Sequence, residues 1–412
     1  MNVPGLIKLS SKPLANRTDA RLRIAVLVDR FGKRFGGAES YCVNVVSAMA
    51  MHHEITVIAH EFEHDLPIRE IRVQKSDLWP SWYRVWRFAQ KAQQLTREGY
   101  DIVHSHVNGP TGHVHTVHVT PFKYRHIAGK TLGRQALAML SPRNLAYVHL
   151  EAARLKLVSG RHVVTVSPAT RDQIEAAYAP EVDIEVLPPG VRPVARDATL
   201  RRQTRASLGW SDNETGYLLV ARNPLRKGLR ALLLAMRHMP LDARLAVVGA
   251  NEATRHFIDT QFPDLADRVC LIEPVSDVSR YYQAADIYVH PTLNDAFAMA
   301  PLEAMAHGLP VIVSSVQYCG LAQYLTHRRD AWILDDPNDP QALAQAMLRL
   351  GHDDLLRRGI VRHASRIVDA FAWSKVAERY EHIYRESIRE RLNSTPALPA
   401  GAERIAASLS LS

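Results

Sequence analysis

The chain has 412 residues, which is too long for one compact hydrophobic core and suits two domains of ordinary size. Hydrophobic residues make up 47% and charged residues 23%, a composition typical of a globular protein. No apolar run approaches the roughly 20 residues that span a bilayer. The three cysteines are too few and too widely spaced for a disulfide framework or a zinc knuckle. We therefore expect a protein of the reducing cytoplasm.

The net charge of +9 is concentrated in the first half of the chain. Residues 1–190 hold 24 Lys and Arg against 17 Asp and Glu, and residues 102–171 hold nine basic residues and one acid. Such a surface attracts an anionic partner. A phosphate-bearing acceptor, an anionic membrane and nucleic acid are the three candidates. From the charge alone, a solvated basic face without a partner remains the alternative.

The first part of the chain alternates between strands and helices. Residues 1–21 have no continuous apolar segment, and we expect a disordered lead-in there rather than a secretory signal. The aliphatic run over residues 23–29 predicts a strand buried on both faces, followed by a glycine loop and a helix from Tyr41. Further strands are expected over 54–60, 101–106, 163–168 and 184–191, with helices over 82–98 and from Thr170. This alternation predicts a doubly wound parallel sheet.

The segment LPPGV (187–191) interrupts this pattern, and a second series of strands and helices follows. Its strands are expected over 216–222, 244–250, 268–275, 286–291 and 309–315. We therefore predict an α/β protein with two Rossmann-like domains. The expected divisions are a first domain over 22–192, a second over 193–372, a last helix over 373–391 and a flexible tail over 392–412.

Two loops have the composition of phosphate-binding loops. Gly36 and Gly37 lie between a buried strand and a helix, where bare backbone and a helix N-terminus suit a diphosphate, although the pattern G-x-G-x-x-G is absent. Arg222, Arg226 and Lys227 follow the first strand of the second series, at the sheet edge where ligands bind. Fixed cations there would stabilise a diphosphate leaving group as its charge develops. A tight turn and a solvated basic loop are the alternatives.

Asp295 and Glu303 stand eight residues apart around the start of a short helix. We expect Glu303 in the first helical turn, where a carboxylate suits the helix dipole and accepts hydroxyl hydrogen bonds. Five histidines, among them His118, cluster over residues 104–118. No carboxylate or cysteine accompanies them, so structural roles are favoured over a metal site.

These segments resemble the family 4 retaining glycosyltransferases of GT-B fold, in matching order over about residues 22 to 390. The matching segments are GGAE (36–39), VSPATRDQI (166–174), VLPPGV (186–191), VARNPLRKG (220–228), AADIYVHPTLNDAF (284–297) and PLEAMAHGLPVIVSS (301–315). Within that family, the segments 116–125, 226–228 and 316–325 are similar to lipopolysaccharide core glucosyltransferase I. The resemblance implies two Rossmann-like domains that face each other across a donor-binding cleft.

The resemblance also implies roles for single residues. Gly36 and Gly37 would face the donor, Arg222, Lys227 and Arg226 would hold its phosphates, and Glu303 would hold the ribose hydroxyls. Asp295 would contact the donor sugar and His118 would line the acceptor side. Family members usually have Glu-Gly-Phe-Gly where this chain has Asp295, Ala296, Phe297 and Ala298. The last helix, after Phe371-Ala-Trp373, is similar to one that crosses back to the first domain.

The implied reaction moves a hexose from a nucleotide diphosphate sugar, for which we favour a UDP-sugar, to a lipid-linked or lipopolysaccharide core acceptor. The family retains the anomeric configuration and lacks an agreed carboxylate nucleophile, so a front-face displacement is implied. No cofactor is expected, since the nucleotide diphosphate sugar is a co-substrate. No metal is expected either if Arg222 and Lys227 neutralise the diphosphate. A nucleotide-sugar epimerase, a sugar phosphorylase and a basic nucleic-acid-binding protein are the other candidates, and no RNA-binding motif supports the last.

A further expectation concerns the membrane. Residues 78–88 interleave Trp79, Trp82, Tyr83 and Trp86 with Arg84 and Arg87. Such aromatic and basic residues suit the headgroup region of an anionic bilayer. The sequence therefore predicts peripheral docking on the inner face of the cytoplasmic membrane, and packing of these aromatics into the core remains the alternative.

Overall fold

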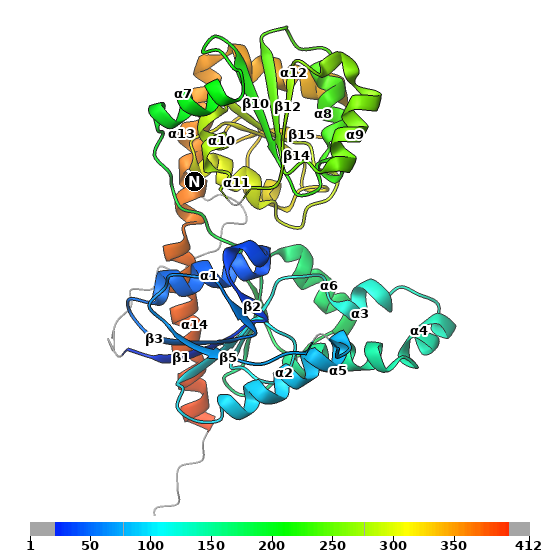
Figure 1. The fold of residues 1–412 in the computed structure, drawn as a ribbon. Coiled ribbons are helices and arrows are strands. Elements are labelled where there is room, and N and C mark those ends of the chain that lie inside the picture. Colours follow the sequence, from blue (N-terminus) through cyan, green and yellow to red (C-terminus); the bar gives the residue numbers. More distant parts are fainter. Residues whose placement is uncertain (1–20, 77, 276, 395–412) are drawn as a thin grey trace, which may run out of the picture. The chain divides into compact units, whose positions relative to one another are not determined.

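The computed structural model describes residues 21–76, 78–275 and 277–394, and it divides the chain into two compact units (Figure 1). The described part of the N-terminal unit comprises residues 21–165, 171–185 and 377–394. The described part of the C-terminal unit comprises residues 166–170 and 186–376. The expected lead-in and most of the expected tail lie outside the described residues. No helix within the described ranges is long and apolar enough to cross a membrane.

The N-terminal unit is built on a seven-stranded sheet. Its strands, in spatial order, are β5 (Arg69–Arg72), β3 (Glu54–Ala59), β1 (Arg23–Leu27), β6 (Ile102–Ser105), β7 (Val114–Val117), β8 (His162–Thr165) and β9 (Ile184–Val186). The pairs from β5 to β8 are parallel. All of β1 after Arg23 is buried, as expected of a strand covered on both faces. A short ribbon of β2 (Arg30–Phe31) and β4 (Glu61–Phe62) accompanies the sheet.

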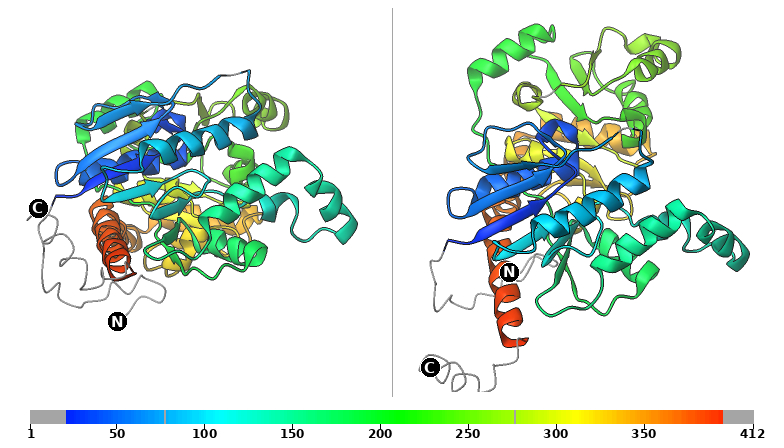
Figure 2. Two further views of the ribbon diagram at one scale, coloured as in Figure 1. Left: turned by 90° about the horizontal axis from the view of Figure 1, so that it is seen from below. Right: turned by 60° about the horizontal axis from the view of Figure 1, so that its bottom comes forward.

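Helices connect these strands. They are α1 (Gly37–Met49), α2 (Ser81–Leu95), α3 (Phe122–His126), α4 (Leu132–Met139), α5 (Pro142–Arg154) and α6 (Pro168–Tyr178), with a 3-10 turn, η1 (Lys33–Phe35), before α1. Two views show α4 projecting from the sheet of this unit (Figures 1 and 2). Helix α1 begins four residues before the predicted start at Tyr41, because the glycine loop itself turns into the helix.

The C-terminal unit contains a six-stranded parallel sheet. Its order is β12 (Val269–Ile272), β11 (Ala243–Val248), β10 (Thr215–Val220), β13 (Ile287–His290), β14 (Val311–Ser314) and β15 (Trp332–Leu334). Its helices are α7 (Ala198–Ser207), α8 (Leu229–Met236), α9 (Glu252–Gln261), α10 (Ser279–Ala284), α11 (Met299–Ala306), α12 (Pro340–His352) and α13 (Asp354–Ala370). The 3-10 turns are η2 (Pro224–Lys227), η3 (Pro263–Leu265) and η4 (Gly320–Tyr324).

Side-chain caps fix where several of these helices begin. Asp197, Asn251, Asp339 and Asp353 each accept hydrogen bonds from backbone N–H groups in the first turns of α7, α9, α12 and α13. Such a cap contributes about 1 kcal/mol to a helix.

Both sheets share one topology, in which the first strand lies at the centre and the chain winds outward in both directions. The direction changes between β1 and β6 in one unit and between β10 and β13 in the other. Ligands of open α/β sheets bind beyond the carboxyl ends of the strands at this switch point. The predicted site loops follow β1 and β10, so both lie at switch points.

The last helix, α14 (Trp373–Ser394), contributes to the N-terminal unit from residue 377 onward. Tyr380 and Tyr384 are fully buried there, and Ser387 donates a hydrogen bond to the carbonyl oxygen of Gly160 at 2.6 Å. Figure 2 shows α14 beside the first sheet. The helix continues to Ser394, so the expected tail does not begin at residue 392.

Candidate functional site

The loop after β10 is held against the end of β13 by a glycine. Gly228 has φ +84°, and a Cβ atom there would meet the carbonyl oxygen of Pro291 at 1.9 Å. Only glycine permits both this left-handed conformation and this close approach. The preceding turn η2 therefore carries Arg226 and Lys227 directly beside the segment that follows β13.

Lys227, Asp295 and His290 form a connected polar cluster at the switch point between β10 and β13. The Lys227 ammonium donates to Asp295 Oδ2 at 2.6 Å and to the carbonyl oxygen of Asn294 at 3.3 Å. His290 Nε2 lies 3.2 Å from the same Asp295 oxygen. Tyr288 Oη lies 3.3 Å from His290 Nδ1, so Tyr288 helps to orient the imidazole.

The electrostatics of the cluster keep Asp295 ionised. Burial alone would raise the pKa of Asp295, but the hydrogen bond with His290 and the charge of Lys227 outweigh it and bring the pKa to about 2. Burial lowers the pKa of His290 despite the neighbouring carboxylate, so its imidazole stays neutral. A neutral imidazole beside a carboxylate donates its Nε2 proton to that carboxylate. Asp295 therefore presents a fixed negative charge.

The backbone around Asp295 is fixed by the segment after β14. Asp295 N–H donates to the carbonyl oxygen of Tyr318 at 2.8 Å, and Gly320 N–H donates to the carbonyl oxygen of Asp295 at 2.9 Å. Asp295 Oδ1 accepts from the N–H of Ala298 at 3.1 Å. Ala298 caps α11 with φ +73°, a left-handed conformation that costs an alanine about 1–2 kcal/mol. Strain of this kind persists where the surrounding structure imposes it.

Glu303 lies in the second turn of α11, and the prediction of a first-turn position is wrong. The left-handed Ala298 delays the start of the helix to Met299, and the first turn contains no acidic residue. Tyr282 donates a hydrogen bond to Glu303 Oε2 at 3.2 Å. Burial raises the pKa of Glu303, and this hydrogen bond opposes the rise. Glu303 is thus a largely buried acid with spare capacity to accept hydroxyl hydrogen bonds.

The other predicted donor residues differ in exposure. Arg222 and Arg226 are exposed, and their guanidinium groups form no ion pair with any residue that the structure describes. Ala296 is exposed, whereas Phe297 packs against Tyr324 and Phe371 with ring centroids 6.2 and 5.7 Å away. A ligand at this loop would therefore meet the backbone of Phe297 rather than its ring.

Gly36 and Gly37 lie in the N-terminal unit, at the start of α1. Glu39 occupies the first turn, and a Cβ atom on Gly36 would meet its Oε2 at 2.6 Å. Glu39 Oε1 lies 3.6 Å from Arg30 Nη2, which offsets part of its charge. Nothing lies within 4 Å of a Cβ position on Gly37, so the backbone there is open to a ligand.

His118 follows β7 and stacks on His106. Their rings are 5.1 Å apart with an interplanar angle of 12°, and His106 Nδ1 lies 2.8 Å from His118 Nε2. Burial lowers the pKa of His118 to about 3, with a smaller contribution from Arg154, so the ring is neutral. The cluster behind it is also structural: His104 bonds to Tyr384 Oη and Thr116 Oγ1, each at 2.7 Å. His104 is thus held by two hydroxyl groups, whereas His106 and His118 hold each other.

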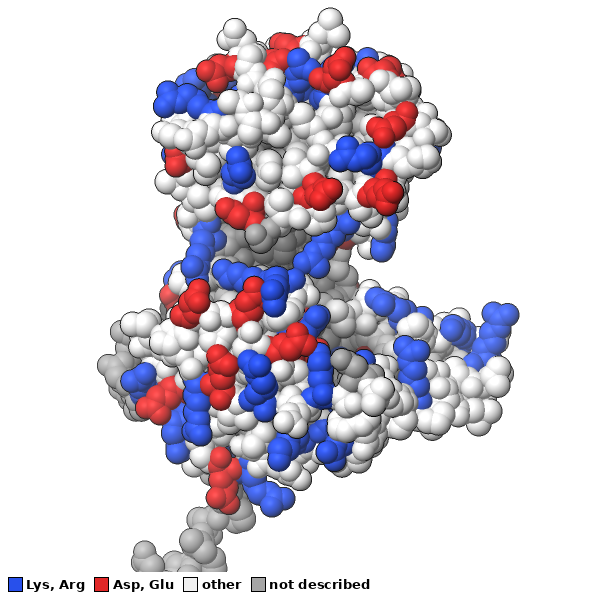
Figure 3. Space-filling view, in the orientation of Figure 1, with Lys and Arg blue, Asp and Glu red and all other residues white. Residues whose placement is uncertain are grey.

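A cavity of about 470 Å³ lies in front of His118 at the carboxyl ends of β1, β6 and β7. We call it the His118 cavity. It is lined by Arg30, Lys75, Arg84, Arg154, His106 and His118, with Asp29 as the acidic group among its described lining. On the face shown in Figure 3, Lys and Arg side chains gather over this unit.

Arg154 is the buried cation of this cavity. It is 5% exposed, and its Nε forms no hydrogen bond with any described residue. The nearest carboxylate, Glu151, lies 4.0 Å away and already accepts from the N–H groups of Phe122 and Lys123 and the hydroxyl of Tyr178. Burying a cation so incompletely paired costs free energy, so this position suits an anionic ligand.

Sequence reasoning missed His290, Tyr282, Tyr288 and Arg154. The predicted strand DIYVHP includes Tyr288 and His290, and their alternation on one face of that strand is the signal that points to a shared role. Tyr282 carries no comparable signal, because it lies on α10 and its partner Glu303 lies on α11. Arg154 carries none either, because its burial depends on how α5 packs in the folded unit.

Models of two known protein families match successive parts of the chain. Residues 35–194 match the family described as Glycosyltransferase Family 4, and residues 215–353 match Glycosyl transferases group 1. D-inositol 3-phosphate glycosyltransferase of Xylanimonas cellulosilytica is 28% identical over 340 residues, which cover 73% of this chain and 76% of that protein. An uncharacterized glycosyltransferase of Methanocaldococcus jannaschii is 25% identical over 395 residues, which cover 88% and 98%.

Solved structures share the architecture. WaaG, a glycosyltransferase involved in lipopolysaccharide biosynthesis, has a TM-score of 0.70 at 21% identity, covering 88% of this chain and 99% of that one. Anabaena HepE, solved with UDP and glucose, has a TM-score of 0.65 at 17% identity, covering 88% and 99%. These likenesses confirm the predicted GT-B fold with its two Rossmann-like units.

Proposed function

We propose that the chain transfers a hexose, with retention, from a nucleotide diphosphate sugar to a phosphate-bearing acceptor, which is lipid-linked or a lipopolysaccharide core. The proposal starts from the finding that the chain is a glycosyltransferase of GT-B fold with a family 4 and a group 1 domain. The observation that carries the proposal is the Lys227–Asp295–His290 cluster at the switch point between β10 and β13. The two family matches favour transfer over the alternatives of an epimerase, a phosphorylase or a nucleic-acid-binding protein.

In this proposal the C-terminal unit binds the donor. Arg222, Arg226 and Lys227 meet the diphosphate, whose negative charge grows as the bond to the sugar breaks. The three cations take the part that a metal ion plays in other transferases, and we propose a metal-independent reaction. The ionised Asp295, held by His290, accepts hydrogen bonds from sugar hydroxyls.

Glu303 would bind the nucleotide in the same unit. Two neighbouring ribose hydroxyls can donate to the two oxygens of one carboxylate. Burial makes Glu303 a strained anion in the free protein, and these hydroxyls would supply the hydrogen bonds that it lacks. A UDP-sugar is the donor that we favour, which accords with the UDP bound in the HepE structure.

Retention follows in the proposal from displacement on one face of the sugar. The bond from the anomeric carbon to the leaving phosphate breaks, and the bond to the acceptor oxygen forms on the same face. The acceptor hydroxyl proton passes to the leaving phosphate oxygen. Since His118 is neutral and bound to His106, its role would be to orient the acceptor hydroxyl by a hydrogen bond.

The acceptor is proposed to bind in the His118 cavity through a phosphate. Its buried Arg154, together with Arg30, Lys75 and Arg84, suits an anion. Related proteins support two acceptor types: inositol 3-phosphate, after D-inositol 3-phosphate glycosyltransferase, and a lipopolysaccharide precursor, after WaaG, which is involved in lipopolysaccharide biosynthesis.

Donor binding gives the first test. A ligand that binds only the folded state raises the melting temperature. Thermal-shift measurements with UDP-, GDP- and ADP-glucose should show a rise with one of them, most of all UDP-glucose, and the Arg222→Ala variant should reduce that rise. No shift with any of the three would contradict donor binding.

We also propose that the chain binds an anionic membrane peripherally, through α4 and the start of α5. The segment 78–88, where the sequence predicted this contact, packs its aromatic rings against one another around Tyr83. Over α4 and the start of α5, Leu137, Leu140 and Leu145 are 69%, 76% and 46% exposed, beside the exposed cations Arg134 and Arg143. Vesicle flotation tests this: recovery should rise with anionic lipid and fall in Leu137→Ser/Leu140→Ser. The control Leu241→Ser removes a leucine that is 83% exposed in the other unit. Equal recovery of all forms would contradict the proposal.

A further inference from the structure

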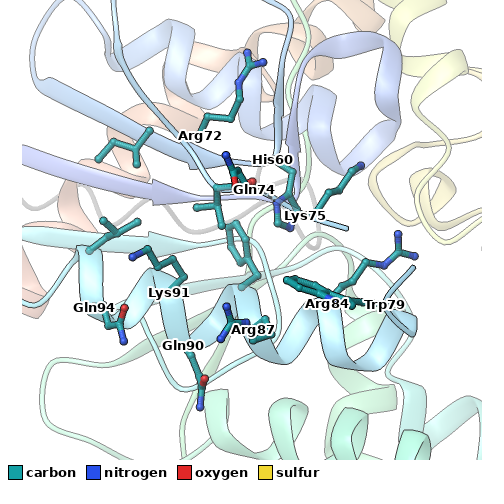
Figure 4. A pocket seen from close by; sticks show the side chains of 14 residues that line it. His60, Arg72, Gln74, Lys75, Trp79, Arg84, Arg87, Gln90, Lys91 and Gln94 are labelled. Atoms are coloured by element: carbon teal, nitrogen blue, oxygen red, sulfur yellow. Dashed lines mark hydrogen bonds between the residues drawn. The ribbon is translucent and has the colours of Figure 1, made fainter. Parts of the chain in front are cut away.

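A second hollow lies beside the His118 cavity in the N-terminal unit, between α2 and the segment that follows β5 (Figure 4). We call it the α2 groove. Its volume is about 480 Å³, and five cations line it: Arg72, Lys75, Arg84, Arg87 and Lys91. No Asp or Glu is among its described lining residues.

The cations come from both walls of the groove. Arg84, Arg87 and Lys91 recur at the spacing of one helix face, so they form a stripe along α2. Arg72 and Lys75 come from the opposite wall, and in Figure 4 their side chains extend away from α2. Like charges collected across so small a hollow repel one another, and an anion between them would relieve that repulsion.

Some of these cations have partners within the protein, and others have none among the described carboxylates. Lys75 forms an ion pair with Glu61 outside the groove. Arg72 and Arg87 lie over the rings of Phe62 and Trp79, 5.6 Å from each centroid. Within the part of the chain that the structure describes, neither arginine nor Lys91 has a carboxylate partner.

The remaining lining residues suit a carbohydrate. Trp79 presents a half-buried ring, and Gln74, Gln90 and Gln94 supply amide donors and acceptors that can pair with hydroxyl groups. The floor is apolar and belongs to the core of the unit, where Phe88 packs with Ile71, Val73 and Leu95. An aromatic ring, amides and cations together match a sugar that carries phosphate.

The groove and the His118 cavity are continuous. His60, Lys75, Arg84 and Phe88 line both. A ligand that enters the His118 cavity can therefore extend along α2 without leaving the protein surface.

We propose that the α2 groove binds a phosphate-bearing carbohydrate segment of the acceptor, at a distance from the hydroxyl that receives the hexose. The inference rests on the proposed acceptor role of the His118 cavity. It favours the lipopolysaccharide core over inositol 3-phosphate, because it requires an acceptor larger than a single phosphorylated ring, with at least one anionic group beyond the reacting unit.

The test uses the full chain with Arg87→Gln/Lys91→Gln, two exposed residues outside the proposed donor site and the His118 cavity. The control Arg97→Gln/Lys156→Gln removes the same charge from two exposed positions of the same unit that line neither hollow. The acceptors are deacylated lipopolysaccharide core, which is soluble, and the same core after removal of its phosphates. We expect the groove variant to raise KM for the phosphorylated core by about tenfold or more, as loss of charge-assisted hydrogen bonds implies. Its kcat, its donor KM and its KM for the dephosphorylated core should stay unchanged.

A binding measurement keeps this test independent of turnover. Calorimetry with glucose 6-phosphate should show binding to the wild type and the control, weaker binding to the groove variant, and weaker binding still of plain glucose. Equal KM changes for both cores, or unchanged binding of glucose 6-phosphate, would overturn the inference.

Loss of flotation with anionic vesicles in the groove variant, with sugar phosphate binding intact, would assign the groove to lipid headgroups and overturn it too. If no acceptor is turned over, the proposed function fails, whereas the calorimetry still decides whether the groove binds a sugar phosphate.

Discussion

At the scale of single residues, the proposed donor site depends on charges that are held before any ligand arrives. The charged Lys227 and Asp295 are paired at 2.6 Å, and His290 holds the carboxylate from the other side. Such preorganised groups stabilise a transition state without reorganising during the reaction. The neutral His118 and the buried Arg154 give the N-terminal unit a similarly fixed arrangement.

Replacing Lys227 by alanine should reduce kcat by about 10²–10³, the effect of losing one group aimed at a developing negative charge. The folded state should persist, because Lys227 is 25% exposed and lies in a loop. Steady-state kinetics at saturating donor measures the change, and Arg230→Ala, an exposed cation on the next helix, is the control. Nearly full turnover in the Lys227 variant would remove this residue from the phosphate-binding group.

Replacing Glu303 by glutamine should weaken nucleotide binding and stabilise the free protein. Because burial raises the pKa of Glu303, the folded state binds its proton more tightly than the unfolded state. Stability from this group is present at low pH and is lost as pH rises through the raised pKa. The melting temperature of the variant should therefore exceed that of wild type at pH 7, and the difference should shrink at pH 4. The affinity of the variant for UDP, measured by calorimetry, should fall. Unchanged UDP affinity would leave Glu303 without a role in the nucleotide site.

Replacing Ala298 by glycine should stabilise the protein by about 1 kcal/mol, because glycine adopts the left-handed conformation without the cost to alanine. The matched control is Ala300→Gly, inside α11, which should destabilise by roughly 0.5–1 kcal/mol. Urea unfolding gives both values. Destabilisation by both substitutions would show that the left-handed backbone carries no strain.

At the scale of elements, the sequence predicts the strands that lie at the centre of each sheet. The runs before Gly36 and Arg222 are long and aliphatic, because β1 and β10 are covered on both faces. The segments that it does not predict are short or lie at edges, such as β5, where three of the four residues are exposed. An edge strand needs no continuous apolar run, so its sequence is indistinguishable from a loop.

The same limit applies to the site. Lys227 and Asp295 can be chosen from their loops and from a family resemblance, but their ion pair depends on β10 and β13 being neighbours, which is a fact of topology. The α2 groove likewise cannot be predicted from the sequence, since Arg72 and Lys91 come to line one hollow only when the segment after β5 packs near α2. The exact start of α11 could not be predicted either, because it depends on the left-handed Ala298.

Gly228→Ala tests whether the β10 loop must touch β13. A Cβ atom 1.9 Å from the carbonyl oxygen of Pro291 has to move the loop, and Lys227 with it. We expect a lower melting temperature and a fall in kcat comparable to that of Lys227→Ala. Gly308→Ala is the matched control, because Gly308 also has positive φ, +73°, with nothing within 4 Å of its Cβ position. Equal effects of both substitutions would attribute the loss to backbone conformation alone.

At the scale of the whole molecule, each unit carries the chemistry expected of one substrate. The C-terminal unit presents cations and two acids at its switch point, which suit a nucleotide sugar. The N-terminal unit presents two connected basic hollows, which suit a phosphorylated acceptor. Part of the uneven charge that the sequence shows lines these hollows, although Arg154 alone of the nine basic residues in 102–171 does so.

The most direct measurement is transfer from UDP-glucose to lipopolysaccharide core or inositol 3-phosphate, followed by NMR of the glycosidic product. Metal-independent transfer with retention predicts UDP release that requires an acceptor, a product with the same anomeric configuration as the donor, and turnover that persists in the presence of EDTA. Release of UDP without an acceptor-linked product, or a product with inverted configuration, would contradict it.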